Sequence, residues 1–233
     1  MPDAEHPTDR RRFLASVAGT TAAIAAAGLS ARELFAQRTY PEYAQPQGGW
    51  DLSWVDRVTR SKHRQAFDVT EVGDGLAFTN ALVYLRGYAD VFRTTDAEMG
   101  VVMVVRHRAM ALVLNDALWA RARYGEKNKL KDPMTGEITT RNPFVNLKPD
   151  DKFAAILVDG GLDTLIKRGV TVLCCNLALM RVAGETAKEE GIPVETARSQ
   201  FIDGLLPGVI RQPSGIFAIA HAQEMGCHFI KST

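Results

Sequence analysis

The sequence predicts an α/β protein: a single three-layer domain whose five-stranded, mostly parallel sheet carries helices on both faces. Short apolar, β-branched segments with the length of buried strands alternate along the chain with longer segments of helical period. The clearest strand, at residues 100–105, has the sequence Gly-Val-Val-Met-Val-Val, and the segment 170–173 is similarly apolar. Strands that alternate with helices pair in parallel through right-handed crossovers.

The composition is that of an ordinary globular protein. The chain has 233 residues, 46% of them hydrophobic, and a formal net charge of +1, which is enough material for one sizeable core. The near-zero charge gives no electrostatic reason to expect a nucleic-acid partner. Three cysteines, two of them adjacent, make no disulfide framework. No motif predicts a cofactor, and no close-spaced ligand set predicts a metal site.

The N-terminal residues resemble a twin-arginine export signal. Arg10 and Arg11 form the pair, Phe13 and Leu14 follow, and an Ala-rich apolar run extends to residue 29. The run is short for a membrane span, which favours a cleaved signal over residues 1–36; an uncleaved anchor is the alternative. A cleaved signal and an uncleaved anchor both place the rest of the chain outside the cytoplasm, in the periplasm, with no other membrane contact. A Pro- and Gly-containing linker is expected over residues 37–60.

The domain is expected to begin at residue 61 with a strand at 63–69. A helix over 74–88 follows, with Asp74 as its N-cap, and then the strand at 100–105. One continuous helix is expected from 109 to 124. Asn and Asp are poor residues for a helix interior, so Asn115 and Asp116 within it indicate a specific bond, a site or a subunit contact.

Residues 125–150 interrupt this alternation with a segment rich in Lys, Asn, Pro and Gly. A connection of this length is a functional flap, an oligomer contact or a mobile insertion. The remaining elements are expected as a helix at 152–168 broken at Gly160-Gly161, a strand at 170–173, helices at 176–190 and 196–205, a strand at 207–211, a helix at 215–224 capped by Ser214, and a strand at 227–231.

The pair Cys174-Cys175 is expected where the strand at 170–173 ends and the next helix begins. Ligands bind at the carboxyl ends of strands in open α/β sheets. A thiol there also meets the positive end of the helix dipole, which favours thiolate, the reactive form. The competing interpretation is that both thiols are small buried hydrophobes. Strand alternation points Cys174 the other way, towards the core, and Cys227 is also expected there.

The order of elements and two motifs resemble the DsrE/DsrF-like family of sulfur-relay proteins. The motifs are Cys175-Asn-Leu-Ala-Leu179 after a buried strand, and the ending that runs from Pro207-Gly-Val-Ile through Pro213-Ser-Gly215 to Ala222-Gln-Glu-Met-Gly226. The resemblance covers roughly residues 63–231. It implies a five-stranded parallel sheet, a homotrimer or homohexamer, and a sulfur carried as a persulfide on Cys175. It also implies partner proteins that donate and accept the sulfur.

His107, with Arg106 and Arg108, follows the strand at 100–105 and so shares the sheet edge with Cys175. This cluster is the candidate source of a proton donor or cation beside the thiolate, with His107 as the candidate site residue and a solvated turn as the alternative. The expected function is an exported sulfurtransferase-like sulfur carrier or thiol-redox protein that acts through Cys175. The alternatives are a non-catalytic oligomeric binding or assembly module and a protein that binds a small ligand or metal loaded before export.

Overall fold

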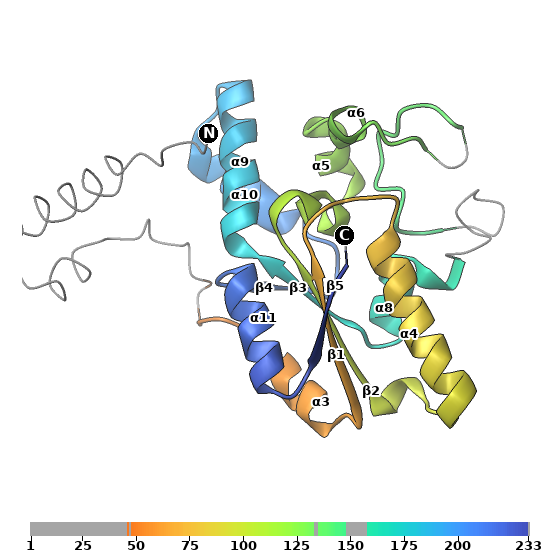
Figure 1. The fold of residues 1–233 in the computed structure, drawn as a ribbon. Helices are drawn as coiled ribbons and strands as arrows, with labels where there is room; N and C mark the ends of the chain where they lie inside the picture. The colour runs from red at the N-terminus through yellow and green to blue at the C-terminus, as the bar shows by residue number, and fades with distance from the viewer. Residues whose placement is uncertain (1–45, 47, 133–134, 148–157, 233) are drawn as a thin grey trace, which may run out of the picture. The chain divides into compact units, whose positions relative to one another are not determined.

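Five parallel strands form one sheet in the order β4-β3-β2-β1-β5 (Figure 1). The computed structural model describes residues 46, 48–132, 135–147 and 158–232. The strands are β1 (His63–Val69), β2 (Met99–Val105), β3 (Thr171–Cys175), β4 (Val209–Gln212) and β5 (His228–Lys231). The predicted α/β fold with a five-stranded sheet is confirmed, and every strand pairing is parallel.

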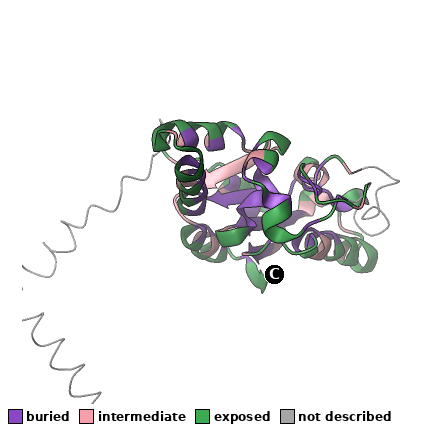
Figure 2. Cartoon of the chain, turned by 90° about the horizontal axis from the view of Figure 1, so that it is seen from above, coloured by how far each residue is buried: buried purple, intermediate pink, exposed green. Residues whose placement is uncertain are grey.

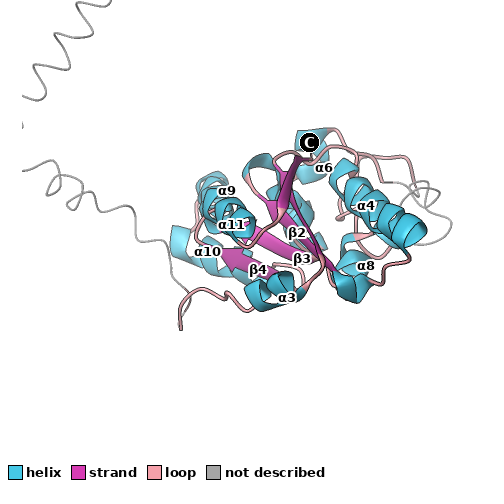
Figure 3. Ribbon diagram, turned by 60° about the horizontal axis from the view of Figure 1, so that its bottom comes forward, coloured by secondary structure: helices cyan, strands magenta, loops and turns pink. Residues whose placement is uncertain are grey.

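Helices cover both faces of the sheet, and the strand order explains which helix lies where. The connections β1 to β2, β2 to β3 and β3 to β4 all step in the same direction, so right-handed crossovers put their helices on one face. The connection from β4 to β5 steps back across the sheet and puts its helix on the other. The first face carries α4 (Leu76–Phe92), α8 (Leu162–Lys167), α9 (Asn176–Glu190) and α10 (Val194–Asp203); the second carries α3 (Trp54–Arg60) and α11 (Gly215–Glu224) (Figures 1 and 3).

The central strand β2 is buried along its whole length because both faces of the sheet are covered (Figure 2). Its side chains alternate between the two layers. Val101, Met103 and Val105 belong to the core cluster of the α4 face, whereas Val102 and Val104 belong to that of the α11 face. The continuous apolar run that predicted this strand thus reflects two cores, one on each side.

The helix predicted over residues 109–124 is wrong. The chain forms a 3₁₀ helix, η2 (His107–Val113), then the short helices α5 (Asp116–Arg121) and α6 (Tyr124–Asn128). Leu114 is extended and bridges Leu205 in the break. Asn115 caps α5 by accepting a hydrogen bond from the backbone N–H of Leu118 at 3.0 Å. The polar pair that sequence reasoning placed inside a helix marks a helix start.

Two expectations near the start of the domain also need correction. The N-cap of α4 is Gly75, which adopts a left-handed conformation, and not Asp74. The expected linker over residues 37–60 is wrong at its end, because its last seven residues form α3. Trp54 and Val58 of that helix are buried in the α11-face core. With only two buried apolar residues in a helix of seven, the sequence pattern was too short to predict this helix.

The insertion at residues 125–150 packs onto the domain where the structure describes it. The side chain of Asn142 is fully buried and donates to the carbonyls of Leu112 and Leu114, each at 3.0 Å. Phe144 is also buried, and its ring lies 5.6 Å from that of Phe78. The expected helix at 152–168 lies partly outside the described residues; its later part forms η3 (Val158–Gly160) and α8.

The C-terminal half follows the sequence prediction closely. The helix α9 ends at Glu190 and is followed by its C-cap Gly191 in a left-handed conformation. Ser214 caps α11 by accepting from the N–H of Phe217 at 3.0 Å. The main difference is that β3 extends two residues further than predicted and includes Cys174 and Cys175. The short helix η1 (Asp96–Glu98), which precedes β2, was not predicted.

Candidate functional site

Polar side chains line the carboxyl ends of four neighbouring strands. In the sheet register Val104 is level with Asp68 and with Leu173, and Cys175 is level with Gln212. Arg106 follows β2 directly and therefore stands level with Cys175. Of these residues Cys175 was predicted as a site residue from the sequence, and Arg106 belongs to the basic cluster that was expected to supply a cation or proton donor beside it. We call Asp68, Arg106, Cys175 and Gln212 the edge row.

Arg106 is held in the edge row by a bidentate ion pair with Asp68. Its Nε and Nη2 donate to the two carboxylate oxygens at 2.7 and 2.8 Å. These hydrogen bonds raise the pKa of Arg106 above its ordinary value, and negative charge on Cys175 adds a smaller effect of the same sign. The guanidinium is therefore a fixed cation near the Cys175 thiol.

Cys175 is the last residue of β3 and the N-cap of α9. Its Sγ accepts a hydrogen bond from the backbone N–H of Ala178 at 3.4 Å. The sulfur thus lies at the N-terminus of a fifteen-residue helix, the positive end of the helix dipole, where negative charge is favoured. The residue is buried, with 6% of its surface exposed.

The other two cysteines occupy environments that keep them protonated. Cys174 is fully buried, and burial raises its pKa to about 12. Burial likewise raises the pKa of Cys227 to about 11. All three thiols are free. The sequence-based expectation that Cys174 and Cys227 are core residues is confirmed.

The end of β4 adds buried polar groups to the same edge. Gln212 is fully buried and donates from Nε2 to the carbonyl of Asp51 at 2.8 Å. Arg211 donates to Oδ1 of Asn176, the first residue of α9, at 3.0 Å. Within the described chain, Oε1 of Gln212 and Nδ2 of Asn176 have no hydrogen-bond partner. Burial lowers the pKa of Arg211, and no carboxylate pairs with it among the described residues.

His107 lies beside the edge row but faces a different space. Its backbone has a φ of 60°, which is rare for a residue other than glycine. The exposed imidazole makes no hydrogen bond to any residue that the structure describes, Cys175 included. It lines a separate cavity together with Arg108 and Arg181. The cation near the thiol is thus Arg106.

Asp68 and Gln212 escaped sequence reasoning because neither stands out from its strand: β1 also contains His63, Arg64 and Gln65, and β4 also contains Arg211. A charged residue at the carboxyl end of a buried strand is the signal that would have found Asp68. Arg10, Arg11, Phe13 and Leu14 of the export motif lie outside the described residues. Among the described residues, no cluster of three or more His, Cys, Asp or Glu side chains is arranged to hold a metal ion.

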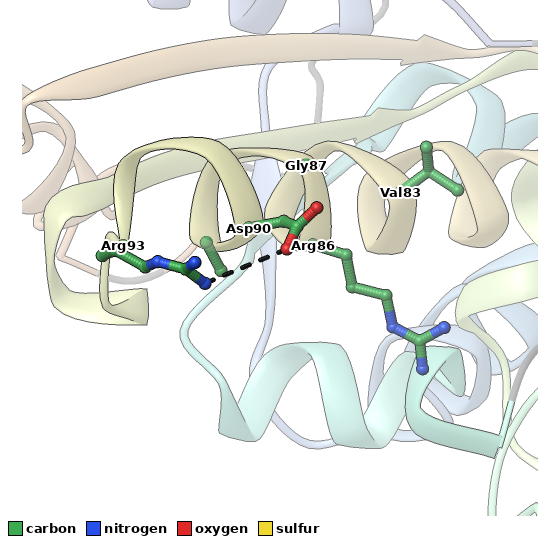
Figure 4. Close-up of a pocket in the computed structure, with 6 residues that line it drawn as sticks. Val83, Arg86, Gly87, Asp90 and Arg93 are labelled. Atoms are coloured by element: carbon green, nitrogen blue, oxygen red, sulfur yellow. Dashed lines mark ion pairs between the residues drawn. The ribbon is translucent and has the colours of Figure 1, made fainter.

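A second hollow runs along the outer face of α4 (Figure 4). It is shallow and is lined by Val83, Gly87 and three charged residues. Arg93 pairs with Asp90 across 3.9 Å, and Arg86 pairs with Asp159 at 2.9 Å. The hollow holds no unpaired polar group of the kind found at the edge row.

No protein-family model matches the chain, and no curated protein matches it. None of the helices within the described segments combines the length and the hydropathy that crossing a membrane requires.

Proposed function

We propose that this chain is an exported, DsrE-like protein that carries sulfane sulfur on Cys175. The observation that carries the proposal is the position of Cys175 Sγ, which caps the N-terminus of α9 while Arg106 stands at the same level of the neighbouring strand. Both groups stabilise a thiolate, which is the form that attacks sulfur.

Sulfur transfer through one cysteine needs no outside oxidant or reductant. The Cys175 thiolate attacks the terminal sulfane sulfur of a polysulfide or persulfide donor, a new S–S bond forms, and the donor's S–S bond breaks to release a thiolate. An acceptor thiolate then attacks the outer sulfur of the Cys175 persulfide and releases Cys175 as thiolate. In this scheme Arg106 stabilises the anionic sulfur in each step, and His107 stays a candidate for exchanging protons with solvent at the rim.

The proposal includes export and assembly. Export to the periplasm rests on the twin-arginine motif at Arg10 and Arg11. Assembly into a homotrimer or homohexamer is supported by the apolar stripe that α4 presents to solvent, where Leu76, Val83 and Val91 are exposed. Donor and acceptor proteins would then approach the carboxyl edge of the sheet.

A second candidate function is a non-catalytic oligomeric module that kept the fold without the chemistry. The deep burial of Cys175 favours it, because a sulfur carrier has to present its sulfur to two partners in turn. The two functions differ in whether Cys175 reacts in the folded protein.

Sulfur uptake from sodium polysulfide separates the two. The folded protein is incubated with polysulfide, freed of the excess, and weighed by intact mass spectrometry before and after treatment with cyanide, which removes sulfane sulfur as thiocyanate. A carrier gains one cyanide-labile sulfur atom, loses this ability in Cys175→Ser, and retains it in the matched control Cys174→Ser. Absence of uptake, or uptake that survives in Cys175→Ser, would refute the carrier and leave the module.

A further inference from the structure

A cavity of about 170 Å³ lies near the carboxyl edge of the sheet, between α6, α9 and the start of η2. Its lining is rich in hydrogen-bond donors, among them Tyr124, His107, Arg108 and Arg181. A water molecule takes up about 30 Å³ in the liquid, so this space suits a ligand of several non-hydrogen atoms. Cys175 does not line it.

Tyr124 contributes an unpaired buried hydroxyl. The residue is 8% exposed, and its Oη is inaccessible to solvent and lacks a hydrogen-bond partner among the described residues. Burial raises the pKa of Tyr124 well above its ordinary value; Glu185 raises it further and Arg181 lowers it. Both of these charged residues line the cavity, as Tyr124 itself does, and the protonated hydroxyl is a donor at neutral pH.

The chain holds Tyr124 rigidly in this place. A Cβ atom at Gly125 would lie 1.9 Å from the carbonyl oxygen of Thr139, so only glycine permits this close approach. Asn128 donates to the carbonyl of Tyr124 at 2.9 Å, and the ring of Trp119 packs 5.7 Å from the phenol. An unpaired hydroxyl in so fixed a position costs free energy unless something binds it.

The cations around the cavity are incompletely neutralised. Arg108 has only a distant ion pair, 3.9 Å from Glu71, and its side chain is largely exposed. Arg181 pairs with Glu185 and also donates to the carbonyl of His107 at 3.4 Å. The left-handed backbone of His107 is a strained conformation of the kind that is found at functional sites. Among the residues that the structure describes, Glu185 is the only carboxylate that lines the cavity.

We propose that this cavity binds a small oxyanion, held by the Tyr124 hydroxyl and by the guanidinium groups of Arg108 and Arg181. The ligand is a phosphate or a short carboxylate, since both offer anionic acceptor oxygens to the donors of the lining and both fit the volume. The site is separate from Cys175, and the proposal stands whether or not Cys175 carries sulfur.

Calorimetric titration of the full chain with sodium phosphate, and separately with sodium acetate, tests this proposal. Chloride balances the ionic strength, because simple screening would otherwise contribute. At least one of the two salts should bind saturably at one site per chain, and the one that binds identifies the class of oxyanion. Tyr124→Phe should weaken that binding by about tenfold or more. Arg108→Gln should weaken it as well. The matched control Tyr84→Phe, in a half-buried tyrosine on α4, should leave it unchanged.

Thermal unfolding without ligand gives an independent check. Tyr124→Phe removes a hydroxyl without a partner, so the melting temperature of the free protein should stay the same or rise. The proposal is overturned if neither salt binds saturably, if Tyr124→Phe binds as wild type does, or if this variant is less stable than wild type in the absence of ligand.

Discussion

At the scale of single residues, the two adjacent cysteines show how one step along a strand changes the surroundings of a thiol. Cys174 lies in the closed core, where burial raises its pKa to about 12, whereas Cys175 ends the strand and caps a helix. The sequence predicted this contrast from strand alternation and the strand–helix junction. It did not predict that Asp68 orients Arg106 beside the thiol, because that contact depends on the register of β1 against β2.

The raised pKa of Cys174 predicts an alkaline loss of stability. The unfolded chain releases this proton near pH 9.0 and the folded chain only near pH 12, so the free energy of unfolding falls as pH rises between these values. The loss should approach about 1.4 kcal/mol per pH unit. Cys174→Ala should cost about 1–2 kcal/mol at pH 7.5 and should lack this part of the alkaline decline. Urea unfolding of the wild type and of Cys174→Ala from pH 7.5 to 10.5 checks this. The prediction is contradicted if the free energies of unfolding of the two proteins fall in parallel as pH rises.

Removal of the Asp68 carboxylate charge should destabilise the fold. Asp68→Asn leaves the Arg106 guanidinium without its counter-charge in a largely buried site, and breaking such a pair costs about 3 kcal/mol. The expected result is a lower urea midpoint. The exposed pair of Arg198 and Glu195 provides a control, since Glu195→Gln should change stability by less than about 1 kcal/mol. Equal losses of stability in Asp68→Asn and Glu195→Gln would show that the Asp68–Arg106 pair contributes no more than an exposed ion pair.

At the scale of elements, the sequence predicted every strand, and most helices, because their apolar periods are strong. It failed between residues 107 and 128, where apolar residues of helical period form three short pieces. The break at Leu114 depends on its bridge to Leu205, ninety-one positions later in the chain, which no local pattern contains. The cavity beside Tyr124 could not be predicted for the same reason, because its walls come from α6, α9 and η2, which are separate segments of the chain.

The contact between α11 and Arg106 requires glycine at position 215. A Cβ atom there would lie 2.5 Å from Cδ and 2.7 Å from Cβ of Arg106. Gly215→Ala should therefore displace the arginine or the helix, cost about 1–3 kcal/mol and slow the alkylation of Cys175. The control Gly184→Ala lies inside α9, where the nearest atom would be 3.9 Å away, and should stabilise by up to about 1 kcal/mol. Chemical unfolding and the rate of Cys175 alkylation are measured for both variants. A Gly215→Ala protein with the stability and alkylation rate of the wild type would refute the close packing.

At the scale of the whole molecule, the strand order brings the ends of β1 to β4 to one edge and leaves β5 as an exposed border strand. The parallel order follows from the alternation of strands and helices in the sequence. The location of the edge row follows from the strand order. Two of its members, Asp68 and Gln212, do not, since nothing in the sequence marks either of them as a site residue.

The proposed oligomer predicts that the apolar stripe on α4 is an interface. Val83→Glu should convert the trimer or hexamer into smaller species, while the free energy of unfolding of the monomer changes by less than about 0.5 kcal/mol because the side chain is exposed. Multi-angle light scattering after gel filtration measures the mass. Val194→Glu, at an exposed valine of α10, is the matched control and should leave the assembly intact. A wild-type protein that is monomeric at all concentrations would contradict the proposal.

The most direct test of the whole account is the order in which the three thiols of the folded protein react. A small neutral alkylating reagent is added to the native chain near neutral pH, and the labelled sites are mapped by peptide mass spectrometry over time. The account predicts that Cys175 is labelled first and alone, that Cys175→Ser takes up no label, and that Cys174 and Cys227 react only after unfolding. Labelling of none of the three thiols before unfolding would contradict it and would make Cys175 a core residue.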